Sequence, residues 1–225
     1  MSDTSMAPVL TIDGPSGSGK GSITQLVAQK LGWHILDSGA LYRLTALAAE
    51  RQAISFEDEI LLSEVASNLE IEFLASEPGQ PVKVLLGGDD VTQQLRLETT
   101  GNNASKVAVL NGVRAALLQC QKDFRKAPGL VADGRDMGTV VFPDAPYKVF
   151  LTASAQARAE RRYEQLKQQG EDVRIATLLQ EIEARDARDM GRKNAPLKPA
   201  DDAIIIDTTD FSIDQVLEKV LELVK

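Results

Sequence analysis

A glycine-rich segment near residue 13 constrains the fold more than any other feature of the sequence. It consists of Asp13-Gly14-Pro15-Ser16-Gly17-Ser18-Gly19-Lys20-Gly21-Ser22, preceded by the apolar run Val9–Asp13 and followed by the helical pattern Lys20–Leu31. Gly14 and the Gly19-Lys20 pair have the spacing of a P-loop, and a strand before and a helix after it are the context that such a loop requires. The sequence therefore predicts a strand–loop–helix unit that binds the phosphates of a nucleoside triphosphate.

The residue types in this loop match the chemistry of phosphate binding. Glycines let the backbone curl so that N–H groups point at phosphate oxygens, and the next helix adds its positive end. Lys20 brings a positive charge to the β- and γ-phosphates. Gly21 stands where most P-loops have a Ser or Thr magnesium ligand, and Ser22 follows. That pattern is typical of nucleoside monophosphate kinases. One alternative is a flexible turn. The other is a dinucleotide-binding loop, but this sequence lacks the G-x-G-x-x-G spacing that such a loop requires.

The rest of the chain alternates short apolar runs with longer amphipathic ones, as βα units do. Strands are predicted at Val9–Asp13, Trp33–Asp37, Leu130–Asp133, Tyr147–Thr152 and Ala203–Asp207. Helices are predicted at Lys20–Leu31, Gly39–Arg51, Val107–Arg125, Ala155–Gln169, Arg174–Met190 and Ile213–Val224. This order predicts an α/β fold, a five-stranded parallel sheet covered by helices, with ligands at the carboxyl ends of the strands.

The acidic residues are concentrated in one part of the chain. The whole chain has 25 Lys and Arg against 33 Asp and Glu, a net charge of −8. The segment Ile54–Ala104 holds ten acids and two bases and alone sums to −8. It contains two predicted strands, Ile71–Leu74 and Val82–Leu86, with turn-forming residues at Glu77–Pro81 and Gly87–Asp90. We therefore expect residues 67–103 to form a small antiparallel β/α insert in a core made of 1–66 and 104–225.

Two further polar clusters follow predicted strands. Leu36-Asp37-Ser38-Gly39-Ala40-Leu41-Tyr42-Arg43 opens the second predicted helix, where Ser38 can cap the helix; a plain N-cap is the alternative interpretation. Ala132-Asp133-Gly134-Arg135-Asp136-Met137-Gly138-Thr139 ends the third predicted strand, and Asp133 stands where a P-loop protein keeps its metal-side carboxylate. A salt bridge within a turn is the alternative for the Arg-Asp pair of this second cluster.

The arginines gather toward the C-terminal part. Seven of the thirteen fall between Arg158 and Arg192, and lysine is scarce there. Helical spacing places Arg158, Arg161 and Arg162 on one face, and Arg185, Asp189 and Arg192 on another. Because arginine suits forked phosphate recognition, we predict that residues from about 155 to 192 form a helical lid that closes over phosphates. A solvated face paired with local acids is the preferred interpretation for Arg174 and Arg188.

These motifs resemble those of the bacterial cytidylate kinases. The resemblance runs from about Val9 to the C-terminus and rests on GPSGSGKGS, LDSGALYR, ADGRDMGTVVFPDA and ARDARDMGR. It implies a P-loop nucleoside monophosphate kinase that uses Mg²⁺ and transfers the γ-phosphate of ATP to CMP or dCMP, giving ADP and CDP or dCDP in pyrimidine nucleotide metabolism. The acidic segment matches the extra domain that bacterial members carry at the monophosphate site.

The resemblance also implies roles for individual residues. The ATP-binding residues would be Gly14, Pro15, Ser16, Gly17, Ser18, Gly19, Lys20, Gly21 and Ser22. The CMP-binding residues would be Ser38, Tyr42, Arg43, Ser105, Arg114, Asp133, Gly134, Arg135, Asp136, Arg185, Asp189 and Arg192. The catalytic residues would be Lys20, Arg158, Arg162 and Arg192, and the candidate metal ligands are Ser22 and Asp133, directly or through water.

The implied base-reading set of Ser105, Arg114 and Asp136 agrees with the chemistry of cytosine. Cytosine offers O2 and N3 as acceptors and an amino group as donor, which an arginine and a carboxylate complement. Uracil reverses N3 and position 4, so both partners would face the wrong groups. Considered by themselves, Ser105 is a hydroxyl at a helix start and Arg114 an exposed arginine on a long helix. No general base is required, because the acceptor is already a phosphate oxyanion.

Composition limits the partners and the location. The acidic balance and ten aromatic residues argue against nucleic acid and anionic membranes as partners. One cysteine, Cys120, excludes an internal disulfide, and one histidine, His34, argues against a histidine-based triad or metal cluster. We expect a cytoplasmic, monomeric enzyme. A kinase of another small acceptor (UMP, AMP or shikimate-like) and a nucleotide-binding regulator or nucleic-acid-stimulated ATPase are the alternatives.

Overall fold

The computed structural model describes residues 6–74, 83–168 and 170–224 of the chain. They form two compact units, which we call the P-loop unit (residues 6–37 and 121–224) and the acidic unit (residues 38–120). The expected insert, 67–103, is a part of the acidic unit, and its boundaries and its role at the monophosphate site stay predictions. Within the described residues, no helix is both long and apolar enough to cross a membrane.

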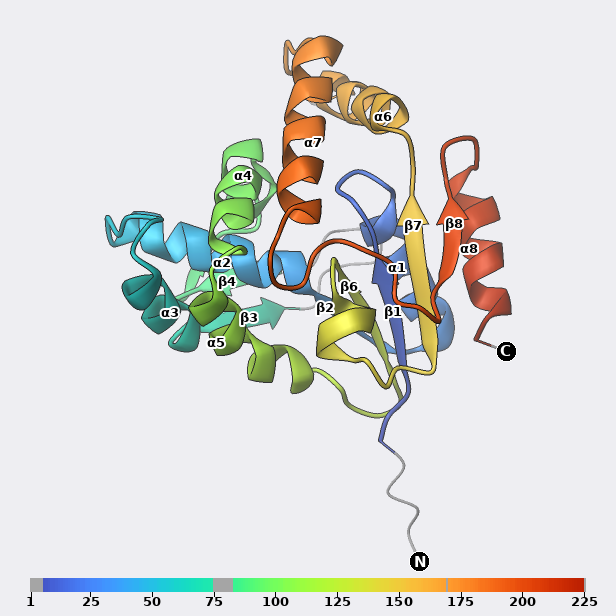
Figure 1. Cartoon of the computed structure of the whole chain (residues 1–225), viewed down its shortest axis with the longest axis horizontal. Helices are drawn as coiled ribbons and strands as arrows, with labels where there is room; N and C mark the ends of the chain where they lie inside the picture. The colour runs from blue at the N-terminus through green and yellow to red at the C-terminus, as the bar shows by residue number, and fades with distance from the viewer. Residues whose placement is uncertain (1–5, 75–82, 169, 225) are drawn as a thin grey trace, which may run out of the picture. The chain divides into compact units, whose positions relative to one another are not determined.

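The P-loop unit is built on a parallel sheet. Its strands are β1 (Val9–Asp13), β2 (His34–Asp37), β6 (Leu130–Gly134), β7 (Tyr147–Thr152) and β8 (Ile204–Asp207). They lie in the order β2-β6-β1-β7-β8, and every neighbouring pair is parallel (Figure 1). All five residues of β1 are buried, as a central strand covered on both faces requires. The predicted fold class is confirmed, with each strand boundary within one residue of the prediction.

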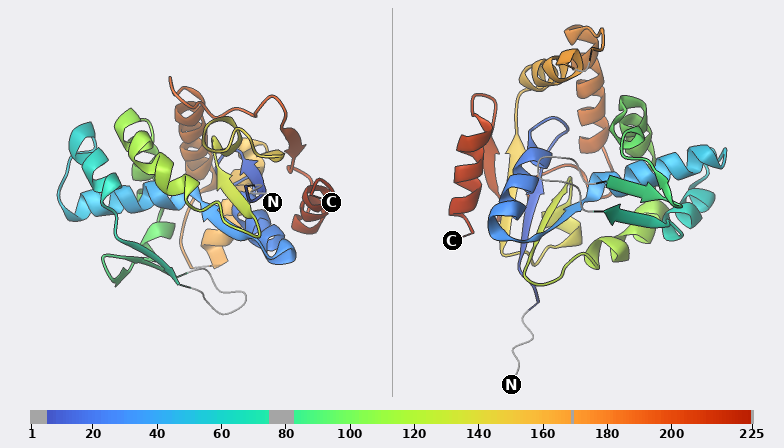
Figure 2. Two further views of the ribbon diagram at one scale, coloured as in Figure 1. Left: turned by 90° about the horizontal axis from the view of Figure 1, so that it is seen from below. Right: turned by 180° about the vertical axis from the view of Figure 1, so that it is seen from behind.

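Two helices cover one face of this sheet. They are α1 (Lys20–Leu31) and α8 (Ile213–Glu222), which pack on each other and share a core with β1, β6 and β7 (Figure 2, right). The left-handed residue Gly32 ends α1 and returns its N–H to the carbonyl of Ala28, as glycine C-caps do. A capping box of Ser212 and Gln215 begins α8.

The arginine-rich helices α6 (Ala155–Gln168) and α7 (Ile175–Met190) form a packed pair in the same unit. They lie beyond the carboxyl ends of the strands, with α6 directly following β7 (Figure 1). Their contact is a small apolar cluster centred on Ala159, Leu166 and Leu178. Both helices were predicted with starts within one residue of those observed, and residue 169 lies outside the described residues.

The acidic unit contains α2 (Ser38–Arg51), α3 (Glu59–Ser67), β3 (Ile71–Leu74), β4 (Lys83–Leu86), β5 (Asp89–Asp90), a 3₁₀ turn at Gln94–Arg96, α4 (Glu98–Val107) and most of α5 (Asn111–Lys122). The three strands are antiparallel: β3 and β4 were predicted, whereas β5 lies within the stretch that was predicted as the turn Gly87–Asp90, where left-handed Gly87 and Gly88 join β4 to β5. The predicted turn at Glu77–Pro81 lies outside the described residues.

The prediction of one helix over Val107–Arg125 was wrong. The chain forms α4 and α5 instead, with a turn at residues 108–110. Residues 98–106 include a glycine, two asparagines and two threonines, which are weak helix formers, so the sequence shows no helical signal there. The helix forms because its small buried residues, Gly101, Ala104 and Ser105, let α4 pack closely on α2.

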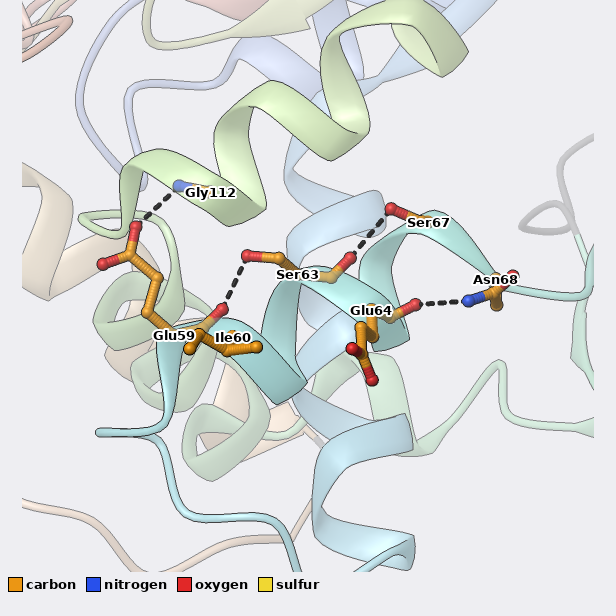
Figure 3. A pocket seen from close by; sticks show the side chains of 7 residues that line it. All are labelled: Glu59, Ile60, Ser63, Glu64, Ser67, Asn68 and Gly112. Carbon is orange, nitrogen blue, oxygen red and sulfur yellow. Dashed lines mark hydrogen bonds between the residues drawn. The ribbon is translucent and has the colours of Figure 1, made fainter.

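Helix α5 meets α3 through the first turn of each (Figure 3). The N–H of Gly112 donates to Glu59 Oε1 at 2.6 Å, and a Cβ at Gly112 would lie 2.3 Å from Ser63 Oγ. The other hydroxyl and amide groups here, those of Ser67 and Asn68, donate to carbonyls of α3 itself. The open hollow of about 450 Å³ beside them is therefore a helix joint, and we assign no ligand to it.

Candidate active site

The P-loop follows β1 and has the backbone that its glycines allow. Gly14, Gly17 and Gly19 have φ values of 149°, 77° and 90°, a region that other residues rarely adopt. Helix α1 begins at Lys20, so the end of this loop is also a helix N-terminus. The loop, its glycine positions and the helix start agree with the sequence prediction.

Three carbonyl groups of the loop accept side-chain hydrogen bonds, one from Lys20 of the loop itself and two from residues outside it. Those of Pro15, Ser16 and Ser18 accept hydrogen bonds from Lys20 Nζ (2.8 Å), Arg158 Nη1 (3.0 Å) and Thr208 Oγ1 (3.2 Å), respectively. In a trans peptide the next residue's N–H points opposite to the carbonyl. The N–H groups of residues 17 and 19 therefore point away from Arg158 and Thr208, which leaves them available on the other side of the loop for a phosphate.

Lys20 is 5% exposed and its ammonium lies 4.0 Å from the carboxylate of Asp133. Burial lowers its pKa to about 7; the positive charges of Arg135 and Arg185 act in the same direction, and Asp133 opposes them. A phosphate group beside Lys20 would favour the charged form, because it adds negative charge at short range. Lys20 is thus suited to holding an anion.

A second buried carboxylate, Asp13, ends β1. Its oxygens accept the backbone N–H groups of Met137 and Gly138, both at 2.8 Å. Burial raises its pKa to about 7, although these two hydrogen bonds act in the opposite direction. The segment Met137–Val141 forms one turn of π-helix, which begins three residues after the end of β6 at Gly134. Asp13 therefore connects the central strand to the polar cluster that follows β6.

Three predicted site residues form an ion-pair network around one carboxylate. Asp189, 1% exposed, accepts Arg135 Nε at 2.9 Å with one oxygen and Arg192 Nη2 with the other. Burial would raise the pKa of Asp189, but Arg135, Arg192 and Arg185 together lower it below the usual value. Burial alone would lower the pKa of Arg135, and Asp189 raises it. All of these charges are therefore retained, with more positive than negative groups.

The structure places Arg158 and Arg162 of α6 differently from each other. Arg158 is buried: it donates to the carbonyls of Ala153 and Ser16 and makes a two-bond pair with Asp186 of α7, at 3.1 and 2.5 Å. It ties the loop to α6 and α7. Arg162 is partly exposed and donates to Gln165 Oε1 at 2.8 Å.

Five of the predicted site residues lie in the acidic unit. Ser38 and Tyr42 are buried on α2, and Ser105 is buried on α4. Arg114 Nη1 on α5 lies 3.4 Å from Tyr42 Oη, and Arg43 Nη1 donates to the carbonyl of Leu95 at 3.1 Å. The acidic unit thus brings the side chains of Tyr42 and Arg114 together, and the base-reading role of Arg114 stays a prediction.

The candidate metal ligands are compatible with magnesium. No cluster of three or more His, Cys, Asp or Glu side chains suited to a metal ion occurs among the described residues. Asp133 Oδ2 lies near the start of α1, 3.8 Å from where a Cβ on Gly21 would be, and Ser22 lies exposed one residue further on. Magnesium commonly binds through one or two protein oxygens, water and substrate phosphates. This donor set fits that mode.

Sequence reasoning missed several residues that shape the site. Asp186 binds Arg158, and Thr208 donates to the loop carbonyl of Ser18. Arg161 donates to the carbonyls of Thr208 and Thr209. Thr208 belongs to none of the motifs described above. Asp186 lies in ARDARDMGR and Arg161 shares a helix face with Arg158, but the sequence does not show which groups they bind. Asp13 was missed as well, although a carboxylate at the end of a largely apolar strand is a signal for a buried polar contact.

The family model and the curated relatives agree with each other. A family model described as cytidylate kinase matches residues 10–225. The chain is 59% identical over 217 residues to the cytidylate kinase of Pseudomonas entomophila (strain L48), covering 96% of this chain and 95% of that protein. It is 59% identical over 214 residues to the cytidylate kinase of Stutzerimonas stutzeri (strain A1501), covering 95% and 93%. A solved shikimate kinase from Bacteroides thetaiotaomicron shares 13% identity, covering 98% of this chain and 99% of its own, with a TM-score of 0.45.

Proposed function

The chain belongs to the cytidylate kinase family, and from this premise we propose which of its residues transfer the γ-phosphoryl group of ATP to CMP or dCMP. The products are ADP and CDP or dCDP. The observation that carries the assignment of residues is the buried network in which Arg135 and Arg192 share Asp189, because it keeps an excess of positive charge in the same unit as the P-loop.

We propose that Gly14–Ser22 bind the ATP phosphates. The loop carbonyls that Arg158 and Thr208 bind support this, since the N–H groups of residues 17 and 19 then point to the other side of the loop. Lys20 would contact the β- and γ-phosphates, and its low pKa in the free protein means that the anion restores its charge. Asp133 and Ser22 would hold Mg²⁺, largely through water and phosphate. When bound, the ion neutralises charge on the phosphate oxygens.

The proposed acceptor residues are distributed over both units. Ser38, Tyr42, Arg43, Ser105 and Arg114 belong to the acidic unit, and Asp133, Gly134, Arg135, Asp136, Arg185, Asp189 and Arg192 belong to the P-loop unit. We propose that Ser38 and Asp189 bind the sugar, the arginines hold phosphate, and Ser105, Arg114 and Asp136 read the base. In a buried site, the reversed donors of uracil would cost several kcal/mol, about the scale of an unpaired polar group.

Catalysis would come from alignment and charge. The acceptor needs no deprotonation, so the protein holds the two phosphates in line and stabilises the charge that develops between them. Lys20, Arg162 and Arg192 would supply positive charge there. Arg158 can join them only by exchanging its Asp186 pair for phosphate, since its guanidinium is otherwise bound to protein groups. We further propose a monomeric, cytoplasmic enzyme with no nucleic-acid or membrane partner.

The test measures ADP release with ATP·Mg²⁺ and, in turn, CMP, dCMP, UMP, AMP and no acceptor. We expect turnover with CMP and dCMP, weak turnover with UMP, and little without an acceptor. ADP release that ignores the acceptor would contradict the kinase, and a preference for UMP or AMP would contradict the base-reading set. Asp136→Asn should narrow the preference for CMP over UMP, and an unchanged preference would remove Asp136 from that set.

A further inference from the structure

We propose that Asp13 is a positioning residue for the acceptor site, holding the turn Gly134–Gly138 so that Asp136 keeps the orientation that distinguishes cytosine from uracil. This inference rests on the proposed base-reading role of Asp136. Asp13 itself belongs to the strand that leads into the P-loop, and the phosphate-binding role of that loop does not require this carboxylate.

Asp13 is bound to this turn by two hydrogen bonds of defined direction. Each carboxylate oxygen of Asp13 accepts a different, consecutive backbone N–H, that of Met137 or Gly138, at 2.8 Å. Asp136 is the residue directly before these two amides, and it is 3% exposed with φ −149° and ψ 25°, outside regular structure. Two bonds from one rigid, planar group fix both the position and the tilt of the backbone that carries Asp136.

The pairing between β1 and β6 ends just before this turn. The β1–β6 ladder ends at the pair Asp13 and Gly134, so no strand pairing holds the residues beyond Gly134 in place on that side. Beyond this pair, the carboxylate of Asp13 connects β1 to the turn through its two hydrogen bonds. Its 4% exposure excludes water as a competitor for these two amides.

The turn is also packed closely onto β1. A Cβ at Gly138 would lie 2.9 Å from Thr11 Oγ1 and 3.4 Å from Asp13 Oδ2, and a Cβ at Gly134 would lie 2.7 Å from Met137 Cγ. The glycines allow the backbone to come within reach of Asp13. The turn therefore has one well-defined position against β1.

An alternative is that Asp13 serves mainly as a counter-charge for Lys20. The charged groups that act on Asp13 or on Lys20 are Asp133, Asp136, Arg135 and Arg185 together with this pair. The ammonium of Lys20 donates to the carbonyl of Pro15, and its salt-bridge carboxylate is Asp133. Both oxygens of Asp13 are instead bound to the turn, so positioning the turn is its direct structural effect.

The experiment compares kcat/KM for CMP with kcat/KM for UMP in four proteins: wild type, Asp13→Asn, Asp136→Asn and the double variant. An amide at residue 13 offers one acceptor oxygen in place of two and opposes its NH₂ to a backbone N–H. We expect Asp13→Asn to reduce the CMP-to-UMP ratio about 5- to 10-fold, the effect of losing roughly one buried hydrogen bond. The double variant should have the ratio of Asp136→Asn alone, because Asp13 acts through Asp136.

Asp207→Asn is the matched control, since Asp207 also ends a strand of this sheet and accepts two hydrogen bonds, from Thr209, but lies on β8. Its CMP-to-UMP ratio should equal that of wild type. Loss of stability alone would lower both kcat/KM values together and leave the ratio unchanged. Gly138→Ala disturbs the same contact without changing charge and should lower the ratio too, which keeps the test available if Asp13→Asn does not fold.

The outcomes separate the two levels of the argument. A wild-type ratio in Asp13→Asn and Gly138→Ala, with a reduced ratio in Asp136→Asn, would overturn the role of Asp13 and leave the proposed function intact. Additive losses in the double variant would also overturn it. A wild-type ratio in Asp136→Asn would instead remove the base-reading role, and the inference with it.

Discussion

Replacement of Gly14 by alanine tests how tightly the P-loop is packed on the sheet. In the structure, a Cβ at Gly14 would lie 2.0 Å from the carbonyl oxygen of Leu151 and 3.0 Å from its carbonyl carbon. These are backbone atoms of β7, which pairs with β1 and with β8, so they cannot rotate away as a flexible side chain can. Relief requires the loop or the strand to move by about 1 Å.

The expected cost follows from two effects. The φ of 149° at Gly14 disfavours any residue with a Cβ, at about 1–2 kcal/mol, and overpacking against a fixed backbone adds about 1–3 kcal/mol. We therefore expect Gly14→Ala to lower the free energy of unfolding by about 2–5 kcal/mol. Gly19→Ala is the matched control in the same loop, because its φ is 90° but no heavy atom lies within 4 Å of the added Cβ. It should cost only the conformational part.

Urea unfolding followed by far-ultraviolet circular dichroism gives both free energies. The KM for ATP, measured on the folded fraction, should rise more in Gly14→Ala than in Gly19→Ala, because only the first displaces the loop from β7. Equal destabilisation by the two alanines would refute the reasoning, since it would show that the loop moves away from Leu151 at no cost.

Two further predictions concern stability. Gly112→Ala should lower the free energy of unfolding by about 1 kcal/mol, since its Cβ would meet the movable Oγ of Ser63 at 2.3 Å; adding Ser63→Ala should restore part of the loss, and no recovery in urea unfolding would contradict this contact. The pKa of Asp13 is raised to about 7, so the contribution of Asp13 to stability is complete below pH 4 and is lost as the pH rises through 7. The pKa of Lys20 is lowered to about 7, so the contribution of Lys20 to stability is present above pH 10.5 and is lost as the pH falls through 7. As the pH rises from 5 to 7, the urea concentration at the unfolding midpoint should therefore decrease in wild type and decrease less in Asp13→Asn. If the midpoint depended on pH equally in the two proteins, the raised pKa of Asp13 would be contradicted.

The elements with strong local signals were predicted closely from sequence. β1 and α1 have the predicted boundaries because an apolar run, a glycine loop and a helical pattern all agree on them. Helix α4 was missed because its stability comes from packing of small residues on α2, which a local pattern cannot show.

The site was predictable in its residue types but less so in its contacts. The sequence indicated Lys20, Asp133 and Asp189 because each belongs to a motif. It assigned Arg158 to phosphate, whereas the structure shows it bound to Asp186 and to the carbonyl of Ser16, residues 28 and 142 positions away. Such pairings depend on the fold, and helical spacing alone does not distinguish an arginine that faces a ligand from one that binds another part of the protein.

The connectivity of the P-loop unit also has a consequence for the order in which the protein assembles. The strands that pair with β1 are β6 and β7, and both come after the acidic unit in the chain. More than a hundred residues must therefore be synthesised after β1 before it can pair with either strand. The groups that fix the loop carbonyls, Arg158 and Thr208, are added later still. Distant closures of this kind slow folding. The acidic unit is contiguous and has local contacts, so during synthesis it can be complete while the nucleotide loop, encoded first, is still without its final shape.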